Sequence, residues 1–115
     1  MKKTAYFARP VTRFNTPPDL LDIRLIQTMG YDVVDIASDK VQQAYAQDGM
    51  VIFELMVKVS DVLFFRAFPD GLIGAGVAKE IGWAESQGVP VFEIPTGVCI
   101  ADRTLSVAQT RERLS

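Results

Sequence analysis

Glu80 lies one helical turn beyond a glycine-rich segment and is the strongest candidate for a chemical role in this sequence. The segment reads Pro69-Asp70-Gly71-Leu72-Ile73-Gly74-Ala75-Gly76 and leads into the helix expected to carry Glu80. Its glycines let a ligand approach the backbone closely, and the first amides of a helix favour an anion. Since residues i and i+4 share a helix face, Gly76 leaves open space one turn before Glu80. A carboxylate beside such a space is a candidate functional group, and a solvated, idle glutamate is the alternative.

The residue types of the chain exclude several kinds of catalysis. The 115 residues include no His and a single Cys, Cys99, which removes Ser-His-Asp chemistry, most zinc sites and an intrachain disulfide. Without a basic partner, Cys99 is predicted to be a small apolar core residue and not a nucleophile. The side chains that remain available for catalysis are carboxylates, Tyr, Lys and Arg. We expect no metal and no cofactor, because the glycines do not match the dinucleotide-binding fingerprint.

The composition also restricts the partners. The net charge is −2, with no Lys/Arg cluster beyond the first three residues, so a nucleic-acid polymer is not expected. A small anion remains possible, because one or two Arg suffice to hold it. No apolar run approaches the ~20 residues of a membrane span, and the lone Cys fits a reducing, cytoplasmic compartment. The 49% hydrophobic content suggests a homodimer or higher homo-oligomer, because so small a domain buries limited surface by itself.

Alternating strands and helices are predicted to bring the candidate residues to one edge of a sheet. We expect a single domain over residues 1–115 with a doubly wound, Rossmann-like α/β sheet of four to five mainly parallel strands. Ligands bind such sheets beyond the carboxyl ends of the strands. Residues 37–47 are polar and show no clear pattern. The expected strands span residues 4–10, 31–36, 61–68 and 89–94, and the expected helices span 19–29, 48–59 and 77–87, with an amphipathic piece around 105–114.

Three motifs stand in this framework. They are Tyr6-Phe7-Ala8-Arg9-Pro10, Ser60-Asp61-Val62, and Gly74-x-Gly76-x-x-x-Glu80-Ile81-Gly82-x-Ala84, which runs into Val89-Pro90-Val91. Together with the order of the elements, they resemble the nucleoside 2-deoxyribosyltransferase family and the related 2′-deoxynucleoside 5′-monophosphate N-glycosidases. The resemblance covers about residues 4 to 94, and the Glu-Ile-Gly-x-Ala block is its most specific part.

The resemblance implies that Glu80 attacks the anomeric carbon of a bound sugar. A carboxylate suits this reaction because it stabilises an oxocarbenium-like transition state. Tyr6 would orient the carboxylate, with a buried strand aromatic as the alternative. Glu54 is implied as the acid that protonates the leaving base, although the family more often has Asp there. Asp48 is the fallback, and a solvated helix carboxylate is the alternative for Glu54.

The resemblance also suggests substrate-binding residues around the same edge. Arg9 and Arg13 would hold a 5′-phosphate, and two surface arginines are the alternative. Asp70 would meet the sugar hydroxyls, and a turn-forming Asp is the alternative. Gly71, Gly74 and Gly76 would offer backbone contacts, although the monophosphate hydrolases have a serine in place of Gly74. In this family, the C-terminal tail completes the site of a neighbouring subunit, which points to Ser106 and Thr110. The resemblance also implies that Asp61 has a structural role.

The expected function is therefore cleavage or transfer of the N-glycosidic bond of a (deoxy)nucleoside or its 5′-monophosphate. Two other interpretations remain. The first is a non-catalytic module of the same fold that binds a nucleotide, which is favoured if Glu54 and Tyr6 do not converge on Glu80. The second is a structural oligomeric subunit, for which side chains would fill the cleft along the glycines.

Overall fold

The described part of the chain forms a sheet of four parallel strands. The computed structural model describes residues 3–94 and 104–114, apart from the side chains of Asp39 and Asp48, and Cys99 lies outside these ranges. All three strand pairings are parallel, so the carboxyl ends of the strands meet at one edge. In the spatial order β2-β1-β3-β4, the strands are β1 (Lys3–Ala8), β2 (Tyr31–Val33), β3 (Val62–Phe65) and β4 (Val91–Glu93).

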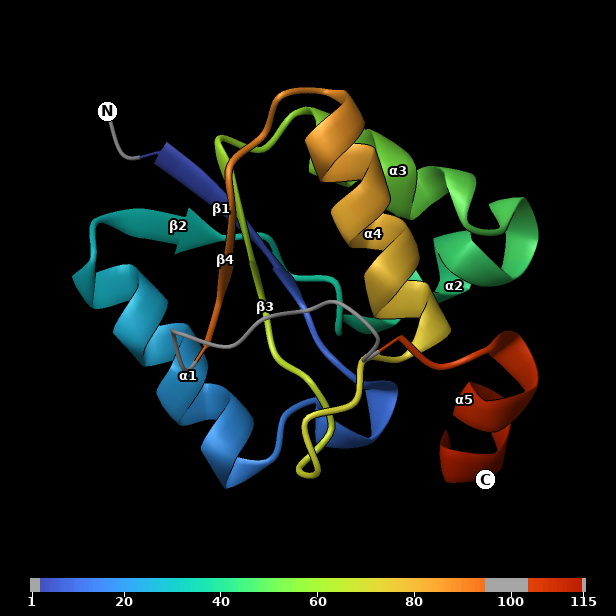
Figure 1. Ribbon diagram of the computed structural model, residues 1–115. Helices are drawn as coiled ribbons and strands as arrows, with labels where there is room; N and C mark the ends of the chain where they lie inside the picture. Colours follow the sequence, from blue (N-terminus) through green and yellow to red (C-terminus); the bar gives the residue numbers. More distant parts are fainter. Residues whose placement is uncertain (1–2, 95–103, 115) are drawn as a thin grey trace.

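Helices cover both faces of this sheet (Figure 1). They are α1 (Pro17–Thr28), α2 (Asp39–Asp48), α3 (Val51–Lys58), α4 (Ala75–Ser86) and α5 (Val107–Leu114), with a 3-10 helix η1 (Val11–Arg13) after β1. On the α1 face, Phe7 packs with Ile26. On the opposite face, Tyr6 packs with Ile81 of α4 and Val57 of α3. Successive strand residues point to opposite faces, and the layering confirms the predicted α/β fold of a small Rossmann-like domain.

Caps and glycines set the ends of two helices that position the site. The Thr16 hydroxyl accepts a hydrogen bond from the Asp19 amide (3.3 Å) at the start of α1. Pro17 occupies the first helical position, where its missing N–H removes no helical hydrogen bond. Gly30 (φ 96°) follows α1 and Gly88 (φ 73°) follows α4, and glycine adopts this left-handed conformation without strain.

The polar stretch 37–47 forms most of α2, an element that the sequence pattern left open. Ser38 caps the helix by accepting a hydrogen bond from the Val41 amide (3.3 Å). None of the described α2 side chains is buried, so the helix carries little apolar periodicity to mark it. Gly49 (φ 72°) ends α2, and the next helix therefore begins at Val51 and not at the predicted residue 48.

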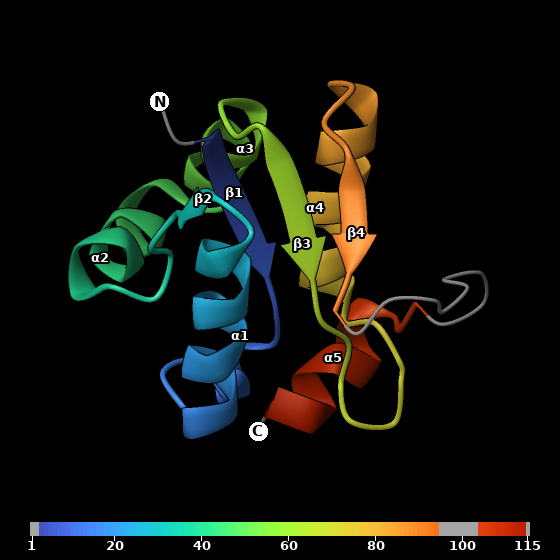
Figure 2. The same ribbon diagram turned by 90° about the vertical axis from the view of Figure 1, so that its left-hand side faces the viewer.

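The C-terminal helix α5 lies at the edge of the sheet toward which the arrows of β1, β3 and β4 point (Figure 2). The buried Leu105 precedes it, and the Leu105 amide donates a hydrogen bond to the Ile73 carbonyl (2.7 Å). This contact fastens the tail to the segment just before α4. Within the described residues, no helix combines the length and the apolar character needed to cross a membrane.

Candidate active site

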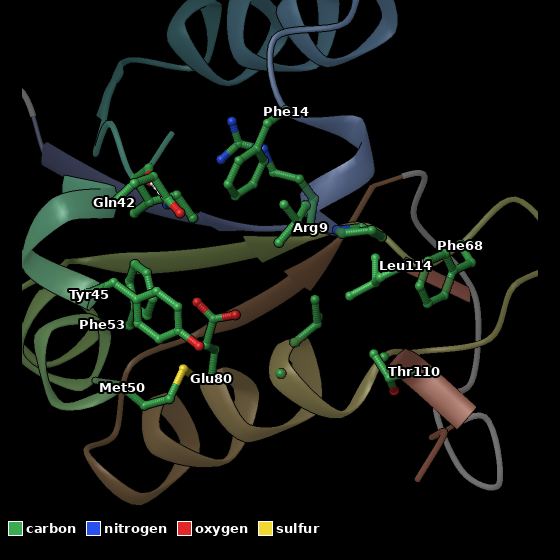
Figure 3. Close-up of a pocket in the computed structure, with 16 residues that line it drawn as sticks. Arg9, Phe14, Gln42, Tyr45, Met50, Phe53, Phe68, Glu80, Thr110 and Leu114 are labelled. Atoms are coloured by element: carbon green, nitrogen blue, oxygen red, sulfur yellow. Dashed lines mark hydrogen bonds between the residues drawn. The ribbon is translucent and has the colours of Figure 1, made fainter. Parts of the chain in front are cut away.

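A cavity of about 210 Å³ lies at the carboxyl edge of the sheet, beside the start of α4. Its walls come from the segment after β1, from α2 and α3, from the start of α4 and from α5 (Figure 3). Open α/β sheets bind their ligands at this edge. The lining is largely apolar, and the charged side chains among the described lining residues are Arg9 and Glu80.

Tyr6 and Glu80 meet at the wall of this cavity. The Tyr6 hydroxyl donates a hydrogen bond to Glu80 Oε2. Tyr6 is fully buried within the core, whereas Glu80 lines the cavity and is 8% exposed. Figure 3 shows the Glu80 carboxylate pointing into the cavity. Strand β1 and helix α4 thus bring together two residues that the family resemblance implied as a pair, and Tyr6 contacts Glu80 from the core side of the cavity wall.

The surroundings of this pair change the ionisation of both groups. Burial raises the pKa of the Glu80 carboxyl to about 7, although the hydrogen bond from Tyr6 and the charge of Arg9 act in the opposite direction. Burial, the charge of Glu80 and the hydrogen bond to it raise the pKa of the Tyr6 phenol far above its usual value. Tyr6 therefore remains a hydrogen-bond donor. Glu80 populates both its protonated and its ionised form near neutral pH.

Arg9 lines the cavity, but a buried carboxylate compensates its charge. Arg9 Nε and Nη2 donate hydrogen bonds to the two carboxylate oxygens of Asp19 at 2.8 and 3.0 Å, and Nη1 donates to the Phe7 carbonyl at 3.0 Å. Both charged side chains are almost completely buried. The guanidinium also lies 4.6 Å from the centroid of the Phe14 ring. Arg9 is thus locked by its own chain, and few of its N–H groups remain for a ligand phosphate.

Arg13, the second predicted phosphate ligand, is not among the residues that line the cavity. Arg13 Nη2 donates to Asp22 Oδ2 at 2.8 Å. Arg66 binds the same carboxylate through Nε at 2.6 Å and Nη2 at 2.8 Å. These three residues form an ion-pair cluster that joins η1, α1 and the end of β3, so the structure gives Arg13 a structural contact.

Gly74 and Gly76 line the cavity, whereas Gly71 does not. A Cβ placed on Gly76 would meet nothing within 4 Å, which leaves the open space predicted one turn before Glu80. A Cβ on Gly74 would lie 3.3 Å from Thr110 Cγ2, so Gly74 accommodates α5. Gly71 has φ 86°, which a turn requires and which an L side chain rarely adopts.

Glu54 and Asp70 are not among the residues lining the cavity. Glu54 lies half-buried in the first turn of α3. Asp70 accepts a hydrogen bond from the Leu72 amide (3.2 Å) and pairs with Arg113 (2.6 Å). The hydrogen bond from Arg113 holds the pKa of the Asp70 carboxyl below its usual value. Asp70 therefore stabilises a turn and anchors α5, while the side chain of Asp48 lies outside those described.

The sequence pattern did not identify the wall that α2 and α3 contribute. Tyr45, Met50 and Phe53 line it, and the Tyr45 and Phe53 ring centroids are 5.1 Å apart. Gln42 adds an amide whose Nε2 donates to the Ile36 carbonyl at 2.7 Å. The helical spacing in this segment did not single out Phe53, so neither its burial nor its place beside the cavity was predicted.

Within the described ranges, no group of three or more His, Cys, Asp or Glu is placed to hold a metal ion. Comparisons of the chain with protein-family models, with curated proteins and with solved structures found no match. The fold and the site together define a small Rossmann-like α/β domain with a buried carboxylate at the wall of a largely apolar cavity.

Proposed function

We propose that this protein cleaves or transfers the N-glycosidic bond of a (deoxy)nucleoside or its 5′-monophosphate, with Glu80 as the nucleophile. The observation that carries the proposal is a buried carboxylate that Tyr6 orients and that points into a cavity at the ligand-binding edge of the sheet. The resemblance of the Gly74 to Ala84 segment to the nucleoside 2-deoxyribosyltransferase family supports the same chemistry.

In the proposed first step, ionised Glu80 attacks the anomeric carbon, and the bond from this carbon to the base nitrogen breaks. The electron pair of that bond leaves with the base, which takes a proton from water. Water or a second base then attacks the anomeric carbon, gives up a proton to the hydroxide left by the first step, and releases the Glu80 carboxylate as the carbon–oxygen bond to it breaks. Tyr6 acts as a positioning residue, because its hydrogen bond holds one oxygen while the negative carboxylate stabilises the oxocarbenium-like transition state.

Release of free base tests this proposal directly. The protein is incubated with 2′-deoxynucleosides, ribonucleosides and their 5′-monophosphates, and the products are separated by chromatography. Base release from at least one compound supports the proposal, and a second added base distinguishes transfer from hydrolysis. Failure to release base from every compound would contradict it.

A non-catalytic nucleotide-binding module is the second candidate function. Glu80 is the only carboxylate among the described residues that line the cavity, so no second acid faces it there to protonate a leaving base. Calorimetric titration with the same compounds separates the two functions. Saturable binding without any release of base would favour the binding module.

Gly76→Ala is expected to lower base release about tenfold or more without destabilising the protein. The new methyl group enters the cavity one turn before Glu80, where nothing lies within 4 Å, while alanine favours a helix by about 1 kcal/mol over glycine. Gly82→Ala is the matched control, because Gly82 lies in the same helix with equally open surroundings and does not line the cavity. Equal turnover of the two variants would place the reaction elsewhere.

We also propose that the protein is a homodimer that buries an exposed apolar row on α3. Val51, Leu55 and Val59 are each at least half exposed and lie at helical spacing, beside a groove between α2 and α3 that includes Val41 and Met56.

Leu55→Glu is expected to give monomers in sedimentation velocity, because a charge is costly to bury at an apolar interface. Leu21→Glu, on the exposed side of α1, is the control. Dissociation by Leu21→Glu alone would assign the interface to α1.

A further inference from the structure

The cavity has two unlike ends on either side of Glu80 (Figure 3). Tyr45, Met50 and Phe53 form one end, where aromatic and thioether side chains suit the flat face of a nucleobase. The other end lies at the first turn of α4, beside Gly74 and Thr110. The described lining residues at this end carry no charge, which suits an uncharged sugar better than an anion. A nucleoside held at Glu80 therefore places its base against Tyr45, Met50 and Phe53 and its sugar toward α5.

Helix α5 closes this second end through contacts within the same chain. Thr110 Oγ1 accepts a hydrogen bond from the Ala75 amide (2.9 Å) and donates one to the Ser106 carbonyl (2.8 Å). The Thr110 methyl group packs over Gly74, which has no side chain to obstruct it. Arg113 pairs with Asp70 at 2.6 Å.

The Arg113 guanidinium also lies 5.3 Å from the centroid of the Phe68 ring. Leu114 extends the wall of the cavity next to Phe68. The tail thus borders the site of its own chain, although the family resemblance pointed to a neighbouring subunit's site.

These contacts leave little at this end to bind a phosphate. The first N–H of α4 is already bonded to Thr110, so part of the anion-binding capacity of the helix start is used. Arg9 is the only cation among the described residues that line the cavity, and Asp19 compensates its charge. A doubly charged phosphate would lose its hydration beside Phe68 and Leu114 without gaining a free cation.

We infer that α5 is a specificity element in which Thr110 and Leu114 select a substrate with a free 5′-hydroxyl over its 5′-monophosphate. The inference rests on the proposed function, because it assigns the two ends of the cavity to base and sugar. Thr110 takes the place that a side chain at position 74 would otherwise occupy. A sugar that ends in a 5′-hydroxyl lies against the Thr110 methyl group and the Leu114 side chain, where the apolar wall ends the cavity.

Binding affinities of 2′-deoxynucleosides and their 5′-monophosphates, measured by titration calorimetry, test this inference. The wild-type protein is expected to bind the nucleoside at least about tenfold more tightly. Thr110→Ala frees the Ala75 amide and opens space beside Gly74, and Leu114→Ala removes part of the apolar wall. Both variants are expected to shift the affinity ratio toward the monophosphate by about tenfold. Val107→Ala is the matched control, because it truncates an exposed apolar side chain of the same helix that does not line the cavity.

A ratio that stays unchanged in Thr110→Ala and Leu114→Ala would overturn the inference, and so would wild-type preference for the monophosphate or wild-type binding of neither compound. Base release by the same variants separates this inference from the proposed function. Binding with the expected ratios but without release would remove the enzymatic proposal and leave the role of α5 supported.

Discussion

Replacing Glu80 with Gln is expected to reduce base release by about 10³-fold or more, because the amide keeps the shape of the side chain but cannot attack the anomeric carbon. The Tyr6 hydroxyl can still donate its hydrogen bond to the amide oxygen, so the cavity keeps its form. Chromatographic detection of free base measures the effect. Glu85→Gln serves as the control, because Glu85 is exposed on the same helix. Turnover of Glu80→Gln at the wild-type rate would eliminate Glu80 as the nucleophile.

The same substitution is expected to stabilise the protein at pH 8. Burial raises the pKa of Glu80 from 4.5 to about 7, so the native state binds this proton more tightly than the unfolded chain does. The free energy of unfolding therefore falls as pH rises from about 4.5 to about 7, and the full penalty, on the order of 3 kcal/mol, is present above pH 7. Gln carries no such penalty at any pH.

Denaturant unfolding at pH 5 and pH 8 measures this difference. The advantage of Glu80→Gln over the wild-type protein is expected to be small at pH 5 and large at pH 8, whereas Glu85→Gln should show no comparable change. An advantage of equal size at both pH values would show that Glu80 ionises normally. Stability gained with loss of activity is the behaviour expected of a carboxylate buried for function.

The Tyr6–Glu80 pair was predicted from the family resemblance, and the placement of the strand and the helix that carry it follows from periodicity and topology. A strand of alternating residues places Tyr6 on one face, and the spacing of Val77, Ile81 and Ala84 orients α4 against that same face. Parallel connections then bring the end of β1 next to the first turns of α4. Such regularities of backbone geometry can be read from one chain.

The partners of the arginines could not be predicted in this way. Arg9 was expected at the mouth of the site, and it does line the cavity. Its guanidinium is, however, paired with the carboxylate of Asp19 in α1. Which carboxylate reaches which guanidinium depends on side-chain packing and on the angle of α1, and neither leaves a periodic signal. The same limit applies to Thr110, whose contact with Ala75 depends on how α5 packs against the start of α4.

The Arg9–Asp19 pair has a second consequence, because it leaves the cavity nearly without free positive charge. A guanidinium that faced the cavity unpaired would attract phosphate and would lower the pKa of Glu80 further than Arg9 already does. With Asp19 in place, Arg9 instead joins β1 to α1 beneath the rings of Phe7 and Phe14. The selectivity proposed for α5 therefore depends on this buried carboxylate as well.

Asp19→Ala is accordingly expected to destabilise the protein by about 3–5 kcal/mol, because it leaves the buried Arg9 cation without its partner. Asp19 is 0% exposed, and its carboxylate also accepts a hydrogen bond from the Asn15 amide (3.0 Å). Urea unfolding measures the loss.

The double variant Arg9→Met/Asp19→Leu is the control, since it removes both charges and should recover much of the stability. If Asp19→Ala and the double variant were equally unstable, the loss would come from packing and from the Asn15 contact. If Asp19→Ala unfolded like the wild-type protein, Arg9 would not depend on this carboxylate, and its charge would be free to meet a phosphate in the cavity.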